Sequence, residues 1–191
     1  MTTEIGRPRD KRIDSAVLRA AVELLAETGY AELSVDTIAR RAGTSKPAIY
    51  RRWPSKAHLV HEAVFPISDA TALPDTGSLA ADVREMVRRT AAVLTTPAAR
   101  AALPGLVGEM AADLTLHSAL LERFGGILSR GLSERLDAAV ERGEARPDVT
   151  AAEVVEAVAG TTFLALLTRG DALDDTWVDR TAALITRGIS V

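Results

Sequence analysis

The sequence predicts an all-α protein, in which a three-helix head containing a helix-turn-helix is joined to a larger helical domain. Apolar residues recur at helical spacing through most of the chain, and no sustained alternation typical of strands is present. Residues around Gly43 also have the caps and the turn of a tight helix pair. The 191 residues are 47% hydrophobic and 26% charged, a composition typical of a globular chain that buries a sizeable core.

The first predicted helix starts at Ile13 and ends at Gly29, about four turns later by the usual helical pitch. Its apolar stripe should pack across the two helices that follow and complete the head. A basic arm precedes it, which either reaches a minor groove and neighbouring phosphates or is simply solvated, as many charged termini are. The cations of the arm are Arg7, Arg9, Lys11 and Arg12.

Residues 34–56 have the features of a helix-turn-helix. Ser34 precedes a run with the i, i+3, i+4, i+7 spacing of one helical face, and its hydroxyl can cap the first turn. Gly43 stops this helix, because glycine takes the left-handed conformation without steric cost. Ser45 then caps a second helix, with Pro47 in its first turn. The apolar positions of the first helix are Val35, Ile38, Ala39 and Ala42.

The second of these helices should bury Ile49 and Trp53, which are four residues apart, and direct a basic face outward. Arginine can bond guanine O6 and N7 together, lysine can meet a phosphate or a base edge, and the tyrosine hydroxyl can bond a phosphate. The predicted partner is therefore double-stranded DNA; the alternative is a solvated basic helix in an ordinary bundle. The outward residues are Lys46, Pro47, Tyr50 and Arg51.

This stretch resembles the TetR family of bacterial transcriptional regulators. The resemblance implies phosphate contacts for Tyr50 and Lys56, backbone contacts for Ser34 and Ser45, and reading of the major groove by residues 46–52. It rests on Ile38-Ala39-Arg40-Arg41-Ala42-Gly43, Ser45-Lys46, Tyr50 and Pro54-Ser55-Lys56, preceded by Gly29-Tyr30. The candidate DNA-binding residues are Ser34, Thr44, Ser45, Lys46, Pro47, Ala48, Tyr50, Arg51, Arg52 and Lys56.

Three positions depart from the family pattern. Thr44 replaces a small aliphatic residue, Pro47-Ala48 replaces the frequent Gly-Thr pair, and Trp53 replaces the usual phenylalanine. The Pro47-Ala48 change alters the surface that reads bases, so the operator sequence does not follow from the resemblance. The other two changes mainly affect packing.

Charge is unevenly distributed. Residues 1–56 contain 11 Lys and Arg against 7 Asp and Glu, although the whole chain has a net charge of −3. A basic head on an acidic remainder is typical of a DNA-binding domain with a body that does not touch DNA. The chain has no cysteine, a charged start and no run of eighteen apolar residues, so we expect a cytoplasmic protein without membrane contact.

The remainder is predicted to be helical. The expected domains are a DNA-binding head over residues 1–56, a connecting helix and loop over 57–77, and a regulatory domain over 78–191. In the third domain, Pro104-Gly105 should break one helix, and Gly125-Gly126 should kink another or begin a new segment. The predicted helices of this domain span residues 79–95, 98–112, 116–143, 150–168 and 175–189.

The last two helices are apolar over more than one narrow stripe, so each should be covered on two sides. One cover is the core of the chain itself, and the other is a second copy in a two-fold dimer. The TetR resemblance also implies a homodimer, whereas the alternative is a fully intramolecular core. The candidate dimerisation residues are Val158, Thr162, Leu166, Trp177, Thr181, Leu184 and Ile185.

The middle helices offer an apolar pocket with a few polar groups, which is typical of small-molecule sites. Its candidate residues are Met86, Glu109, Met110, Leu114, His117, Leu121 and Phe124. For each apolar residue in this set, packing in the core is the competing interpretation. His58 and His61 have a spacing that suits a metal but lack a third ligand, so no metal site is predicted.

No phosphate loop, nucleophile elbow or distinctive acid pair is present, so neither catalysis nor a cofactor is expected. The leading hypothesis is a homodimeric repressor that binds a pseudo-palindromic operator and is released by an unidentified small-molecule effector. A helical small-molecule carrier with a vestigial motif is the alternative from another class. An all-helical enzyme is a third.

Overall fold

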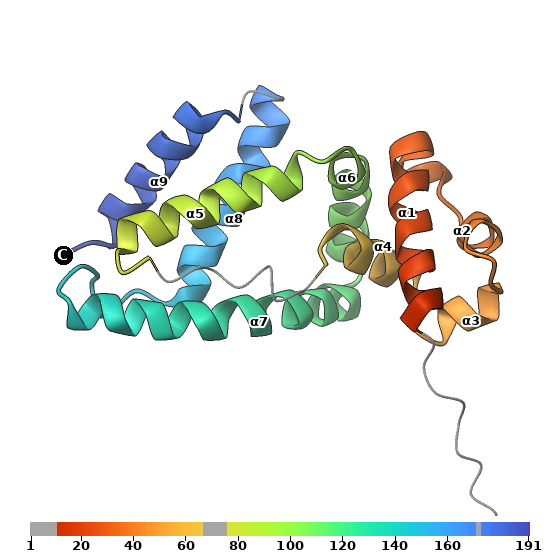
Figure 1. Ribbon diagram of the computed structural model, residues 1–191, viewed down its shortest axis with the longest axis horizontal. Coiled ribbons are helices and arrows are strands. Elements are labelled where there is room, and N and C mark those ends of the chain that lie inside the picture. The colour runs from red at the N-terminus through yellow and green to blue at the C-terminus, as the bar shows by residue number, and fades with distance from the viewer. Residues whose placement is uncertain (1–10, 67–75, 171–172) are drawn as a thin grey trace, which may run out of the picture.

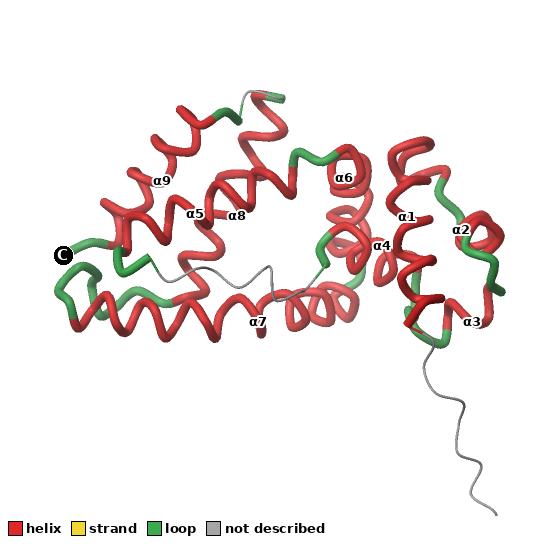
Figure 2. Tube along the Cα trace, viewed as in Figure 1, coloured by secondary structure: helices red, strands yellow, loops and turns green. Residues whose placement is uncertain are grey.

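The computed structural model describes residues 11–66, 76–170 and 173–191, and every regular element in these ranges is a helix (Figures 1 and 2). The predicted all-α class is therefore confirmed. The helices are α1 (Lys11–Glu32), α2 (Val35–Arg41), α3 (Lys46–Tyr50), α4 (Lys56–Val64), α5 (Leu79–Leu94), α6 (Pro97–Ala112), α7 (Leu114–Glu141), α8 (Ala151–Arg169) and α9 (Asp175–Ile189).

The first three helices lie at one end of the molecule, and α5, α8 and α9 lie at the other (Figure 1). Between the two ends, α6 packs against both α1 and α4. One buried cluster joins the head to α6 and to the start of α7. A second cluster joins α5, α8 and α9 to the C-terminal half of α7. The helices that connect head and body therefore belong to the core of the head.

The first helix begins earlier than predicted, since Lys11 and Arg12 lie within α1, while Arg7 and Arg9 are outside the described residues. Gly29 has a φ of 76° and a ψ of 175°, which interrupts the helical backbone. A side chain with a Cβ is strained at this φ, so the glycine allows the chain to redirect before Tyr30. The predicted end of the first helix at Gly29 coincides with this interruption.

The predicted break at Pro104-Gly105 is wrong, because α6 continues through both residues as a helix from Pro97 to Ala112. An interior proline loses one backbone hydrogen bond and crowds the preceding turn, at a cost of about 3 kcal/mol. Four apolar side chains of α6 are buried on both sides of the proline, and their packing offsets this cost. They are Ala98, Ala99, Ala102 and Leu106.

The eighth helix is apolar and only partly covered. Thr150 and Glu153 form a reciprocal capping box at its start, since each side chain accepts a hydrogen bond from the backbone of the other.

Among the described residues, α8 is the one helix with the length and composition to cross a membrane. Its apolar window has a mean hydropathy of 1.5, and 33% of that window is buried. Core helices of globular proteins meet the same criterion.

The start of α5 is capped from a distant turn. Ser78 makes no side-chain cap, and the Glu144 carboxylate instead accepts a hydrogen bond of 2.7 Å from the Leu79 backbone N–H. The Arg142 guanidinium beside Glu144, together with this N–H, lowers the pKa of the carboxyl to about 2. Arg88, followed by Arg89, likewise lowers the pKa of Glu85 to about 2.

Both carboxyls favour the charged form in the folded state, because their folded pKa lies below the usual 4.5. Their contribution to stability is complete above about pH 4.5 and is lost as the pH falls toward 2. We therefore expect the melting temperature to fall in this window, and to fall less steeply in Glu144→Gln. Thermal melts from pH 6 to pH 2 test this, with Glu141→Gln at an exposed position as the control.

Candidate nucleic-acid interface

Helices α2 and α3 form the predicted helix-turn-helix. The Ser34 hydroxyl accepts a hydrogen bond of 3.1 Å from the Thr37 backbone N–H, and the Ser45 hydroxyl caps α3 in the same way at 3.4 Å from Ala48. Gly43 has a φ of 67° in the turn between them. Both predicted caps and the left-handed glycine are therefore present.

Two large residues hold the inward side of α3 and of the turn that follows it. Ile49 is 1% exposed and Trp53 is 3% exposed, as the spacing predicted. The indole Nε1 of Trp53 donates a hydrogen bond of 2.8 Å to Glu62 of α4. A phenylalanine at this position has no such donor. The tryptophan therefore adds a hydrogen bond between the head and α4.

The outward side of α3 is largely exposed, as expected for a surface that meets DNA. The exposed candidates are Ser45, Lys46, Pro47, Tyr50, Arg51 and Arg52, and the half-buried candidates are Ser34, Thr44, Ala48 and Lys56. Ser34 is partly occupied by its role as a cap, and it also shares a hydrogen bond of 2.8 Å with the Thr37 hydroxyl.

Several cations near this surface are already paired with carboxylates of the same head. Lys46 Nζ lies 2.7 Å from Asp36, and Arg41 donates to Glu27 at 2.7 Å. Arg52 bonds Asp14 of α1. The Asp36 carboxylate raises the pKa of Lys46, and the Arg41 guanidinium lowers the pKa of Glu27.

Arg51 and Lys56 differ from these paired cations. Arg51 is exposed and has no carboxylate partner within the described part of the chain. Lys56 Nζ donates 3.1 Å to the Tyr30 carbonyl and lies 4.1 Å from the centroid of the Tyr30 ring. Both of its contacts are neutral, so the positive charge of Lys56 is not cancelled.

Comparison with known families agrees with this geometry. Residues 17–63 match the model of bacterial regulatory proteins of the tetR family, and residues 73–185 match the model of the tetracyclin repressor-like C-terminal domain. Together the two models cover most of the chain. The protein belongs to the TetR family. It is therefore a DNA-binding transcriptional regulator with a helix-turn-helix head and a helical ligand-binding body.

Individual relatives support the same assignment. The DNA-binding transcriptional repressor TetR of Mycobacteroides abscessus is 33% identical over 178 residues, which cover 90% of each chain. The crystal structure of the TetR family transcription regulator SCO0332 superimposes with a TM-score of 0.70 at 31% identity, covering 94% of this chain and all of that one. FadR of Bacillus subtilis in complex with stearoyl-CoA shares the fold, with a TM-score of 0.64 at 16% identity over 92% of this chain and 98% of that one.

The pairing of Lys46 leads to a prediction about this regulator. Asp36→Asn should raise affinity for DNA of any sequence, because Lys46 no longer has a carboxylate that competes with phosphate. The slope of log affinity against log salt should steepen by up to about 0.9 per protomer, the value for one added phosphate contact. Salt titrations on a random-sequence duplex measure this slope.

A matched control lies in the body. Asp179 pairs with Arg84 at 2.6 Å, with exposed fractions of the two side chains close to those of Asp36 and Lys46. Asp179→Asn changes the net charge equally but away from α3, so its salt slope should remain that of the wild type. Equal slopes for both variants would show that Asp36 acts only through net charge.

The candidate effector residues do not form one group. Met86 is buried in the cluster around α5, whereas Met110 packs against the head cluster and Glu109 lies beside Tyr30. His117 is half-buried, while Leu114 is 78% exposed and therefore is not a pocket wall within the protomer. The side chains of Leu121 and Phe124 lie outside the described residues.

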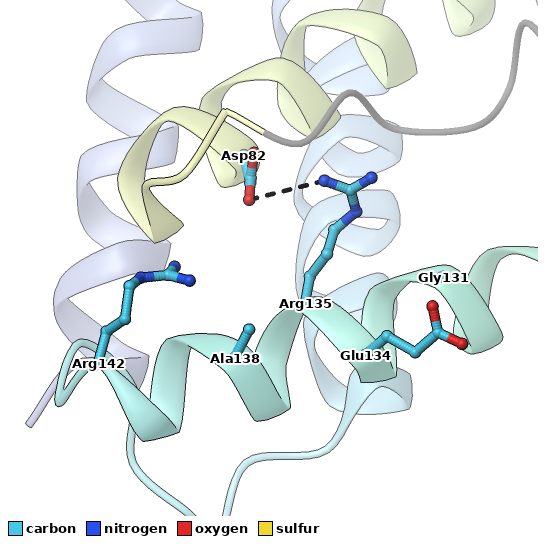
Figure 3. A pocket seen from close by; sticks show the side chains of 6 residues that line it. All are labelled: Asp82, Gly131, Glu134, Arg135, Ala138 and Arg142. Carbon is cyan, nitrogen blue, oxygen red and sulfur yellow. Dashed lines mark ion pairs between the residues drawn. The ribbon is translucent and has the colours of Figure 1, made fainter.

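Described residues of the body line two cavities, and none of the candidates whose side chains are described lines either. The smaller, about 140 Å³, lies between α5 and α7, where Arg135 extends to 4.0 Å from the buried Asp82 (Figure 3). Arg142 points toward the same space (Figure 3). The larger, about 300 Å³, lies between α9 and the start of α8, with Val154 and Ile185 in its wall. The contact between Asp82 and Arg135 in the wall of the smaller cavity links α5 to α7.

The candidate dimerisation residues are mostly covered by their own protomer. Only Leu184 is exposed, at 67%, and the other six are buried in the core of the body. Two further leucines of α8 that the sequence analysis did not select, Leu164 and Leu167, are 61% and 60% exposed. These exposed leucines of α8 and α9, Leu164, Leu167 and Leu184, are here called the leucine face.

The two histidines of α4 have separate roles. His58 Nδ1 shares a hydrogen bond of 2.9 Å with the Ser55 hydroxyl, and the His61 ring lies 5.3 Å from that of Phe65. In the described ranges no three side chains that bind metals gather at one point.

Sequence reasoning did not identify the acidic partners of the DNA-facing cations or the contacts of Tyr30. Asp36 and Lys46 are 10 residues apart, and Asp14 and Arg52 are 38 apart. No local spacing rule connects residues at these separations, so only the three-dimensional packing of the head reveals them.

Proposed function

We propose that this TetR-family protein is a homodimeric repressor that binds a pseudo-palindromic operator and releases it when a small molecule enters the body. The observation that carries the proposal is the exposed surface of α3 and of its C-cap Arg51, which has no carboxylate partner in the described ranges. The DNA-binding domain spans residues 1–56, residues 57–77 connect it, and residues 78–191 form the regulatory domain. The expected location is the bacterial cytoplasm.

In this proposal, α3 lies in the major groove. Arg51 faces base edges, where bidentate bonds from arginine to guanine discriminate between bases. Lys46 meets a phosphate or a base edge. Tyr50 and Lys56 meet phosphates, and the remaining candidates are Ser34, Thr44, Ser45, Pro47, Ala48 and Arg52. The capped, buried framework of α2 and α3 supports this arrangement, because it fixes the direction in which the α3 side chains point.

Repression and response to a ligand are supported by two relatives. The Mycobacteroides abscessus relative is named as a repressor, and the FadR structure contains stearoyl-CoA. The second domain of the present chain, which does not face DNA in this arrangement, suits an effector site. An effector that shifts α6 or α4 changes the position of the head, and DNA must then weaken effector binding by the same factor.

A second copy on the leucine face explains why α8 is so apolar and yet poorly covered. A two-fold dimer through α8 and α9 buries the three exposed leucines and holds two heads at a fixed spacing. Half-sites of helix-turn-helix dimers lie about 34–36 Å apart or at multiples of that distance, which demands such a fixed spacing.

The test is binding of the purified full-length protein to the DNA upstream of its own gene, measured by fluorescence anisotropy at several salt concentrations. We expect tight binding to a short pseudo-palindrome within this DNA, with affinity falling steeply as salt rises. Binding equal to that of random DNA of the same length would contradict the proposal.

A further inference from the structure

Tyr30 lies at the joint between the DNA-binding head and the body. It follows the break in α1 at Gly29, and its ring is buried, with 8% of the residue exposed. It belongs to the cluster that includes α4, α6 and the start of α7. Around it, α1 lies alongside α6, with α4 next to both (Figure 1).

The ring of Tyr30 packs directly on the backbone of α6 at Gly105. A methyl group on the Gly105 Cα would lie 2.1 Å from Cδ1 of the ring and 2.6 Å from Cγ, which is much closer than any real carbon contact. At Gly108, about one turn later in α6, an added methyl group meets no atom within 4 Å. The contact therefore depends on one glycine and leaves no gap between the ring and α6.

Tyr30 also contacts Lys56, the first residue of α4. Lys56 Nζ donates to the Tyr30 carbonyl at 3.1 Å and lies 4.1 Å from the ring centroid, within cation–π distance. An ammonium group has three N–H donors, so two remain for a phosphate. Because the carbonyl and the ring are neutral, they orient Lys56 without cancelling its charge.

A third contact joins the hydroxyl end of the same side chain to α6. The hydroxyl approaches the Glu109 carboxylate without a hydrogen bond of regular geometry. Burial first, and the carboxylate second, raise the pKa of Tyr30, so the hydroxyl stays protonated at neutral pH. Glu109 and Gly105 are four residues apart, so both lie on the face of α6 that meets the ring.

We propose that Tyr30 is a positioning residue for DNA binding, which ties the phosphate-contacting Lys56 to α6 through the close contact at Gly105. The proposal rests on the proposed function. Tightly packed interiors transmit displacement, since they contain few voids in which a shift is absorbed. A movement of α6 therefore displaces the ring, and the ring displaces Lys56. In this coupling the displacement passes from α6 to Tyr30 of α1 and then to the Lys56 side chain, and it does not require α4 to tilt.

The experiment compares Gly105→Ala with Gly108→Ala in the full-length protein. Both substitutions increase helix propensity in α6 by a similar amount. Only Gly105→Ala pushes the ring, so we expect it to weaken operator binding by about 5-fold or more, the lower end of usual couplings. Its salt slope should also decrease by about 0.9 per protomer, because one phosphate contact is lost. Gly108→Ala should match the wild type in both measurements.

A double-mutant cycle shows whether Lys56 carries the effect. In the Lys56→Ala background, Gly105→Ala should change neither operator affinity nor salt slope any further. Equal losses for Gly105→Ala and Gly108→Ala, or an undiminished loss in the Lys56→Ala background, would overturn the inference while leaving operator binding by the wild type intact. Absence of operator binding by the wild type would overturn the proposed function itself.

A second pair of variants covers the case in which Gly105→Ala does not fold. Tyr30→Phe keeps the ring that faces Lys56 and removes only the hydroxyl, so its salt slope should be steeper than that of Tyr30→Leu. Tyr30→Leu removes the ring that faces Lys56, so the salt slope should decrease as in Lys56→Ala. Equal behaviour of the Phe and Leu variants would overturn the role of the ring.

Discussion

Replacing Arg51 by alanine is expected to abolish most of the preference for the operator while leaving the fold intact. The side chain is exposed, and within the described ranges no carboxylate holds it, so its removal costs the free protein little. A bidentate bond to guanine contributes about 1–3 kcal/mol of discrimination, and a dimer makes it in both half-sites. The ratio of operator affinity to random-duplex affinity should therefore be at least tenfold lower in Arg51→Ala than in the wild type.

The adjacent arginine is the matched control. Arg52 bonds Asp14 of α1, and its guanidinium lies 5.9 Å from the centroid of the Trp53 ring, so this side chain is anchored within the head. Arg52→Ala removes the same charge from the next position but should retain the ratio of operator to random affinity. If both variants lost this ratio equally, α3 would contribute charge only, and base reading would have to lie elsewhere.

Local signals explain why the helix-turn-helix could be predicted in detail. Ser34, Gly43 and Ser45 act through hydrogen bonds and backbone angles within a few residues of themselves, so their roles follow from the order of the chain. The same is true of the last helix, predicted over 175–189 and observed as α9 (Asp175–Ile189) behind the Asp174 cap. Burial of Ile49 and Trp53 likewise follows from their spacing alone.

Packing between distant segments explains what could not be predicted. Continuation of α6 through Pro104 depends on side chains buried against the head, which local propensity does not reveal. Glu109 was a candidate effector contact because of its charge, yet it lies beside Tyr30 at the joint. Charge and spacing identify a polar residue on an apolar helix, but only the fold shows which surface it faces.

The last two helices show a further limit of periodicity. Both the leucine face and the core face of α8 are apolar, and hydrophobic spacing is the same for a residue covered by its own chain and one covered by a second copy. Thr162 is fully buried and bonds the Val158 carbonyl at 2.7 Å, whereas Leu164, two residues later, is 61% exposed. Exposure within a single protomer is what separates the two faces.

The leucine face leads to the second large effect, which is loss of the proposed dimer. In the double variant Leu164→Glu with Leu184→Glu, two carboxylates per protomer, and four per dimer, would enter an apolar interface. Burying an unpaired charge costs several kcal/mol, so we expect the dissociation constant of the dimer to rise by at least about a hundredfold. Sedimentation velocity at micromolar concentration should then show a monomer.

The same variant should lose operator binding even though every residue of α3 is unchanged. A monomer meets one half-site only, so the contacts of the second head no longer add to the affinity. Leu114→Glu is the control, because Leu114 is 78% exposed but lies at the start of α7, away from α8 and α9. We expect it to remain dimeric and to bind operator as the wild type does. A double variant that stayed dimeric would place the interface on another surface, and the spacing of the heads would then have to be set there.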